Sequence, residues 1–145
     1  MIKEVIHATK LSQVMAQPVI TVKTQDEFHI VWEKMDLYDI RHLPVVNDLG
    51  CLVGLITERS LYKIHSPRKL EDGSWYYDSD VLDGFILTKV MQHNPFTLKE
   101  DNTLAEAMKA MTQFKYGCIP IVNKDLIPVG IVTRNNIIKH FLNHA

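Results

Sequence analysis

The chain has 145 residues, enough for one compact domain, and its 46% hydrophobic and 23% charged residues are ordinary for a soluble globular protein. A formal net charge of -1 argues against a general attraction to nucleic acid or anionic membrane, and no apolar run approaches the ~20 residues that span a bilayer. The N-terminus lacks the apolar core of a secretion signal, so we expect a cytoplasmic protein. Cys51 and Cys118 lie in apolar stretches and are expected to be buried thiols rather than a disulfide.

The first half of the chain predicts the order strand, helix, strand, strand, helix. Residues 19–22 form a short β-branched run, and Thr24 with Glu27 has the pattern of a capping box at the start of a helix. The apolar face of that helix comprises Phe28, Val31, Trp32 and Met35. Residues 43–46 and 52–56 predict a hairpin, and Thr57 is the expected N-cap of a second helix over residues 58–64.

Residues 65–86 separate this half from the next and carry Trp75, Tyr76 and Tyr77 among acidic residues. We expect a surface excursion followed by a short helix from about Asp78 into Met91. Two interpretations of the aromatic residues stay open, since they could form a partner-binding patch or pack over the core as a flap.

The second half repeats the first with an offset of 76 residues. From Leu11 opposite Leu87 to Lys63 opposite Lys139, 13 of 53 aligned residues are identical, where about three would arise by chance. Strands are predicted over residues 119–122 and 129–132, and Thr133 is the expected N-cap of a helix that ends near Leu142. A unit of about 50 residues buries little surface alone, so the two repeats are expected to share a core. The predicted segments are a lead-in (1–10), a first motif (11–64), a linker (65–86) and a second motif (87–145).

A threonine ends the last strand of each repeat where a helix begins. Its hydroxyl lies beside free helix N–H groups, which favour phosphate. Arg59 and Arg134 follow on the first helical turns and match phosphate oxygens with paired hydrogen bonds. Arg41, His42 and Lys115 precede the middle strands and add positive charge. These residues predict an anion site that occurs once in each repeat.

Each repeat also resembles a CBS motif, and the chain resembles a tandem CBS pair, or Bateman module. The resemblance is carried by VMAQPVITV and RHLPVVNDLGCLVGLITERSL in the first repeat, and by VMQHNPFTL and GCIPIVNKDLIPVGIVTRNNI in the second. It covers residues 11–142. It implies an α/β fold of two pseudo-symmetric β-α-β-β-α units packed sheet to sheet, and a homodimer.

The resemblance further implies a regulatory module that binds an adenosine-type ligand, such as AMP, ADP, ATP or S-adenosylmethionine, in the cleft between repeats and signals to a partner protein. The ligand-binding residues expected from it, together with the anion-site residues, are Ile20, Thr21, Arg41, His42, Leu43, Pro44, Thr57, Arg59, Ser60, Phe96, Thr97, Cys118, Ile119, Pro120, Thr133, Arg134 and Asn136.

The sequence departs from the family pattern at the position that holds ribose. The family has an aspartate three residues after the threonine, where this chain has Ser60 and Asn136. Loss of a charge-assisted bond of about 1.5–3 kcal/mol predicts weaker nucleotide binding. The alternative is a ligand-free dimerisation or interaction module. The sequence offers no nucleophile, base or metal set that would indicate an enzyme. His140 and His144 are spaced like two zinc ligands, but no third ligand is evident.

Overall fold

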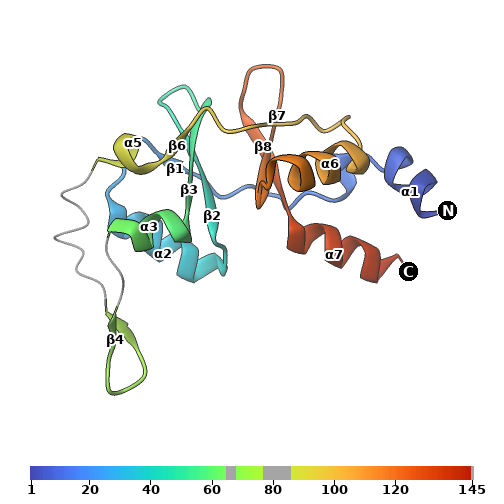
Figure 1. Cartoon of the computed structure of the whole chain (residues 1–145). Coiled ribbons are helices and arrows are strands. Elements are labelled where there is room, and N and C mark those ends of the chain that lie inside the picture. The colour runs from blue at the N-terminus through green and yellow to red at the C-terminus, as the bar shows by residue number, and fades with distance from the viewer. Residues whose placement is uncertain (65–67, 77–85, 145) are drawn as a thin grey trace. The chain divides into compact units, whose positions relative to one another are not determined.

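The computed structural model describes residues 1–64, 68–76 and 86–144 and divides the chain into two compact units. Unit 1 comprises Met1–Val19, Gly50–Leu52 and Pro95–Ala145, and unit 2 comprises Ile20–Leu49 and Val53–Asn94. Each unit therefore combines most of one repeat with the first residues of the other, 11–19 or 87–94, which we call from here on the lead-in of that repeat, as distinct from residues 1–10. Figure 1 shows the elements, and the mixed α/β class agrees with the prediction.

Unit 2 is built on a sheet with the strand order β1-β2-β3-β6. β1 runs parallel to β2, and β3 pairs antiparallel with β6. The strands of this sheet are β1 (Val22–Lys23), β2 (His42–Val46), β3 (Leu52–Thr57) and β6 (Gln92–His93). The helices that accompany them are α2 (Phe28–Tyr38), α3 (Glu58–Ile64) and α5 (Leu87–Val90).

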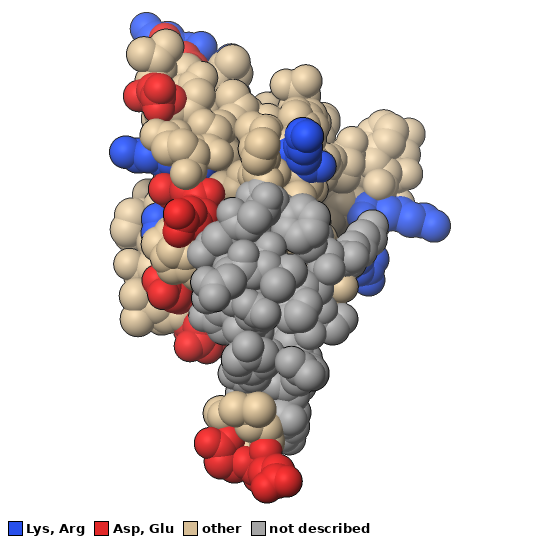
Figure 2. Space-filling model, turned by 90° about the vertical axis from the view of Figure 1, so that its left-hand side faces the viewer, with Lys and Arg blue, Asp and Glu red and all other residues tan. Residues whose placement is uncertain are grey.

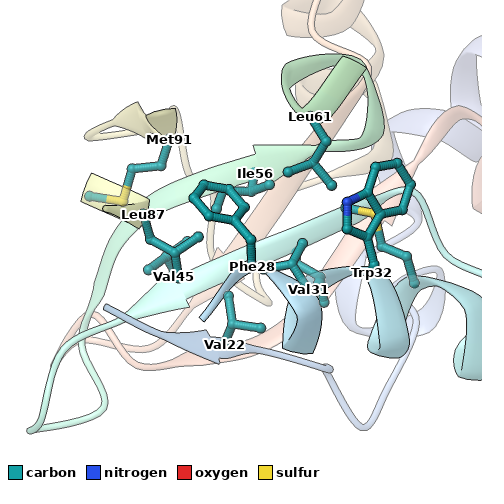
Figure 3. Packing of buried hydrophobic residues seen from close by; sticks show 11 residues of the cluster. Val22, Phe28, Val31, Trp32, Val45, Ile56, Leu61, Leu87 and Met91 are labelled. Carbon is teal, nitrogen blue, oxygen red and sulfur yellow. The ribbon is translucent and has the colours of Figure 1, made fainter. Parts of the chain in front are cut away.

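The apolar face predicted for the first helix forms the centre of the unit 2 core. All four of its residues are buried, and Phe28 and Val31 are completely enclosed. Figure 3 shows Phe28 beside Ile56 of β3, with Leu61 of α3 on the same side and Leu87 and Met91 on the other side of the Phe28 ring. Burial of each large side chain contributes about 1.5–3 kcal/mol relative to exposure. The helical spacing thus determines which face of α2 meets the sheet.

Unit 1 has corresponding elements and one added helix. Its elements are α1 (Ile2–Ala8), the 3-10 turn η1 (Leu11–Gln13), α6 (Leu104–Phe114), β7 (Cys118–Val122), β8 (Pro128–Thr133) and α7 (Arg134–Asn143). The sheet of unit 1 is the two-stranded β7–β8 pair, which forms the predicted hairpin and which Ala16 and Leu98 join through isolated bridges. α1 packs on α6. The core includes Leu104, Ala107 and Met111, which stand 76 residues after Phe28, Val31 and Met35 of the first helix, with Met108 half-buried beside them.

The lead-in of each repeat is exchanged between the units. In unit 2, Gln92 of the second lead-in pairs with Leu55, and in unit 1 Ala16 of the first lead-in pairs with Ile131, which are the corresponding positions at the offset of 76. Sequence analysis predicted one core shared by both repeats. The described buried residues form two clusters, one in each unit, and each cluster contains residues of both repeats.

The glycine in each final strand makes this exchange possible. A Cβ on Gly54 would lie 2.2 Å from Sδ of Met91, and one on Gly130 would lie 2.4 Å from Sδ of Met15. Both methionines come from the exchanged lead-ins and are at least nine-tenths buried. Glycine at these positions leaves room for a methionine from the other repeat, whose side chain would have to shift if a Cβ were added.

Two local predictions differ from the structure. The first strand is Val22–Lys23 rather than 19–22. The Thr24–Glu27 capping box does not form, because α2 begins one turn later with Glu27 as an N-cap whose side chain makes no cap bond. At the aligned position of the second repeat, Thr103 caps α6 by accepting from the backbone N–H of Glu106.

The linker differs as well. A β4–β5 hairpin (Arg68–Lys69 and Trp75–Tyr76) lies within the predicted surface excursion. The helix expected to run from about Asp78 begins at Leu87 with Ile86 as its N-cap, and residues 77–85 lie outside the described residues. The side chains of the three linker aromatics are also outside that description, so both interpretations of them stay predictions.

Candidate functional site

The unit 2 half of the predicted site is organised by Thr57, the last residue of β3. Its Oγ1 accepts a hydrogen bond from the backbone N–H of Ser60 at 3.2 Å, which is the predicted N-cap of α3, and lies 3.0 Å from the Ser60 hydroxyl. The N–H of Glu58 donates to the carbonyl of Arg41 at 2.9 Å, so the start of β2 is tied to the start of α3. The structure thus brings Arg41, Thr57 and Ser60 together.

A lysine that sequence analysis did not single out fixes the Ile20–Thr21 segment of this half. Nζ of Lys34, on α2, donates to the carbonyl of Thr21 at 2.7 Å in a partly buried setting. The bond takes up an acceptor expected to face the ligand. Position 110, the repeat-related residue, is alanine, so unit 1 has no equivalent bond. Nothing in the local sequence pattern indicated this role, because a single lysine on a helix is usually solvated.

Several predicted ligand residues have side chains that belong to the core instead. Leu43 and Ile119 are completely buried, and Pro44, Cys118 and Pro120 are buried beside them in β2 and β7. Only the backbone of these residues is left to meet a ligand. The carbonyl of Pro120 is already an acceptor for the N–H of Leu98 at 3.2 Å. Burial also raises the pKa of the Cys118 thiol to about 12, so the thiol is neutral at physiological pH.

The unit 1 half of the predicted site is organised by Thr133, which forms hydrogen bonds with Asn136. Oδ1 of Asn136 accepts from both the backbone N–H and the hydroxyl of Thr133, each at 2.9 Å, while Thr133 Oγ1 accepts from the N–H of Asn136 at 3.2 Å. This is a complete capping box. An amide oxygen has two lone pairs, so the acceptor of Asn136 is fully used.

An aromatic stack lies in the same unit. The rings of Phe96 and Tyr116 are 5.2 Å apart and nearly parallel at 13°, and Tyr116 in turn stacks on Phe114 at 5.7 Å. Phe96 was a predicted ligand residue, and Thr97 follows it in a half-buried position. One face of Phe96 is therefore already covered by a ring from this chain.

The arginines of both halves reach solvent. Arg59 and Arg134 are exposed on the first turns of α3 and α7, and Arg41 is exposed at the start of β2. His42 is half-buried, and Lys115 is an exposed helix C-cap. The predicted residues up to Ser60 all belong to unit 2 and those from Phe96 onward to unit 1.

The two histidines near the C-terminus form a stacked pair. Their rings lie 4.3 Å apart, and Nδ1 of His144 is 2.8 Å from the carbonyl oxygen of His140. Desolvation, with a smaller contribution from the His144 charge, lowers the pKa of His140. Within the part of the chain that the structure describes, no group of three or more His, Cys, Asp or Glu could hold a metal ion, and no helix is long and apolar enough to cross a membrane.

These two repeats, each with a threonine at its final strand-to-helix step, define a tandem pair of mixed α/β domains. The CBS domain model matches residues 11–66 and 87–143. The chain belongs to the CBS domain family and carries two copies of the domain.

Two relatives show how such a pair occurs in known proteins. A CBS domain-containing protein of Dictyostelium discoideum is 28% identical over 131 residues, which cover 88% of each chain. Inosine-5'-monophosphate dehydrogenase of Methanocaldococcus jannaschii is 29% identical over 143 residues, which cover 95% of this chain but 25% of that enzyme. The pair is thus similar to most of one protein and to a quarter of another.

Two solved structures share the fold. The CBS domain pair of protein MJ0100, in complex with 5'-methylthioadenosine and S-adenosyl-L-methionine, has a TM-score of 0.76 at 23% identity and covers 94% of this chain and 98% of its own. CBSX2 in complex with AMP has a TM-score of 0.76 at 20% identity, with 94% and 98% covered.

Proposed function

We propose that this chain is a regulatory module that binds an adenosine-type ligand and signals to a partner protein. The observation that carries the proposal is the CBS pair itself, since structures of the same fold hold S-adenosylmethionine with methylthioadenosine, or AMP. AMP, ADP, ATP and S-adenosylmethionine are therefore the ligands to test. The ligand is proposed to bind two conformations of the module with unequal affinity, as any ligand-driven switch requires. The module is proposed to be a regulator and not an enzyme.

The first repeat supplies the better ligand contacts in this proposal. The Ser60 hydroxyl lies 3.0 Å from the Thr57 hydroxyl and can rotate toward a sugar hydroxyl, whereas the oxygen of Asn136 is held by two bonds. The exposed guanidinium of Arg59 is proposed to bind phosphate or carboxylate, and Arg41, whose backbone is tied to the start of α3, is proposed as a second cation. Opening the Thr133–Asn136 box would break three hydrogen bonds in a partly buried setting, which disfavours it.

The second candidate function is a ligand-free dimerisation or protein-interaction module. Two observations favour it, namely the closed Thr133–Asn136 box and the Tyr116 ring that covers Phe96. Both fill positions where a ligand was expected. In either function the chain is proposed to act as a homodimer.

A melting-temperature screen separates the two functions. The full chain is heated alone and with AMP, ADP, ATP or S-adenosylmethionine, with and without magnesium. A ligand at 100 times its Kd stabilises by about 2.7 kcal/mol, which raises Tm by several degrees in a protein of this size. The Thr57→Val variant should lose the rise while Thr133→Val keeps it. A flat screen up to millimolar ligand would favour the interaction module.

A further inference from the structure

Lys34 is a half-buried lysine whose ammonium is held at a backbone carbonyl. Its Nζ, on α2, donates to the carbonyl of Thr21 at 2.7 Å. An ammonium has three N–H donors, so this bond leaves two of them for water or a ligand. Among residues 1–64, 68–76 and 86–144, no carboxylate forms an ion pair with Lys34. A partly desolvated cation without an acidic partner favours a bound anion.

The carbonyl that holds Lys34 stands at one edge of the unit 2 sheet. β1 runs parallel to β2, so the residues that precede these two strands lie at the same edge. The N–H of Glu58 donates to the carbonyl of Arg41, which brings the end of β3 to this edge as well. Arg41 precedes β2, and Arg59 lies on the first turn of α3, which follows β3. One edge of the sheet therefore gathers three cationic residues, Lys34, Arg41 and Arg59.

The second repeat has none of these three cations. At the offset of 76, the aligned residues are Ala110 for Lys34, Gly117 for Arg41 and Asn135 for Arg59. Unit 1 forms its corresponding strands and helices without them, and it carries Arg134 and Lys115 at other aligned positions. The fold does not require a cation at any of the three positions, so the set is a feature of unit 2 and not of the repeat.

The rest of unit 2 is acidic. The unit has eight Lys and Arg residues against twelve Asp and Glu. Figure 2 shows the side of the molecule that carries α3, α5 and β4 in Figure 1, and acidic side chains gather along one edge of that face. The overall charge of the unit repels anions, so an anion site there must rely on local cations. The acids adjoining the three cations in the sequence, Asp39 and Glu58, form no ion pair with them in the part of the chain that the structure describes.

The width of this sheet edge favours a phosphate chain over a single phosphate. Neighbouring strands lie about 4.8 Å apart, so β1 and β3, with β2 between them, are about 10 Å apart. Lys34 is bound at the β1 end, and Arg59 follows the β3 end. A single phosphate meets one of these cations at a time, whereas a chain of two or three phosphates spans more of the distance between them. The sulfonium cation of S-adenosylmethionine is repelled by both.

We infer that Lys34 binds the phosphate chain of a nucleoside di- or triphosphate, with Arg41 and Arg59 as further contacts. The Thr21 carbonyl holds the ammonium in place, and its two other N–H groups donate to phosphate oxygens. Lys34 thereby makes the site of the first repeat select ADP and ATP over AMP and S-adenosylmethionine. The inference rests on the ligand-binding function proposed above and specifies the phosphate state of the ligand.

Calorimetric titration of the full chain with ATP, ADP, AMP and S-adenosylmethionine tests the inference. Wild type should bind ADP and ATP at least about tenfold more tightly than the other two, the factor expected of one charge-assisted hydrogen bond. Lys34→Met keeps an unbranched side chain of similar length. It should weaken binding of ADP and ATP about tenfold and of AMP less than about twofold. Lys34→Arg keeps the charge and should restore most of the selectivity.

Lys23→Met is the matched control. Lys23 is exposed on β1 of the same unit, so its loss makes the same charge change outside the proposed contact and should leave the ratio of ADP to AMP affinity unchanged.

Two results would overturn the inference. Equal weakening of all four ligands in Lys34→Met would show that Lys34 supports the Thr21 segment and does not bind phosphate. A wild type that binds AMP or S-adenosylmethionine as tightly as ADP would remove the selectivity, a result that needs no variant and leaves the proposed ligand-binding function intact. Absence of binding by every one of the four ligands would refute that function together with the inference.

Discussion

The exchange of lead-ins makes a quantitative prediction at Gly54. An alanine there would place its Cβ 2.2 Å from Sδ and 2.8 Å from Cγ of Met91, so the methionine must move out of a well-packed site. Overpacking of this kind costs about 1–3 kcal/mol. Removing the methionine in Met91→Ala costs about 2–5 kcal/mol through lost burial and a cavity.

The two changes together should cost less than their sum. Once Met91 is alanine, the added Cβ has room, and Gly54→Ala should then change stability by less than about 0.5 kcal/mol, because alanine also restricts the unfolded chain. Urea unfolding of wild type, both single variants and the double variant measures this coupling. Gly50→Ala is the control for a glycine substitution without a steric clash. Its φ of 83° predicts backbone strain, but no atom lies within 4 Å of the added carbon.

Additive costs would refute the reasoning. If Gly54→Ala destabilised the Met91→Ala background as much as wild type, the methionine of the second repeat would not lie over the glycine of the first. The corresponding pair, Gly130 and Met15, should behave in the same way, which gives an independent repetition within one chain.

Three further outcomes are expected. Thr103→Ala should cost about 1 kcal/mol in urea unfolding because it removes the cap of α6, while Glu27→Ala, whose side chain makes no cap bond, should cost less. A thiol reagent at neutral pH should modify Cys51 in the native protein and Cys118 only after unfolding, because burial raises the pKa of Cys118 to about 12; equal labelling rates would contradict this. The pKa of His140 is lowered in the folded state, so its protonation opposes folding, and stability should fall as pH drops from about 7 to 5. His140→Gln should flatten that decline in pH-dependent urea unfolding.

The fold was largely predictable because the same pattern of strands and helices occurs twice in the sequence. The apolar spacing of Phe28, Val31, Trp32 and Met35 fixed the buried face of α2, and the same offsets in α6 gave an internal check. The Thr133 cap of α7 was read correctly, since a threonine between an apolar strand and a helix has few other roles. The capping box predicted at Thr24 was wrong because Oδ2 of Asp26 accepts a hydrogen bond from the backbone N–H of Lys23. This bond holds a turn at residues 23–26, and the helix begins one turn later.

The exchange of lead-ins was not predictable from one repeat at a time. Met15 and Met91 are aligned with each other, and so are Gly54 and Gly130, but alignment does not tell which methionine covers which glycine. That choice is made by strand pairing, which joins residues far apart in the chain.

Half of the site chemistry could be anticipated and half could not. Thr57 and Thr133 were found from their place in the chain, whereas the side chains of Leu43 and Ile119 proved to be core. The bond from Lys34 to the Thr21 carbonyl and the closure of Asn136 on Thr133 depend on side-chain geometry that residue types alone do not determine.

The central claim, that the first repeat binds an adenosine-type ligand, is tested most directly by calorimetric titration of the full chain with AMP and then with S-adenosylmethionine. We predict saturable binding of at least one of them with a Kd below about 1 mM, abolished in Thr57→Val. Absence of binding heat for both ligands up to several times that concentration, from a chain that melts cooperatively, would contradict the account.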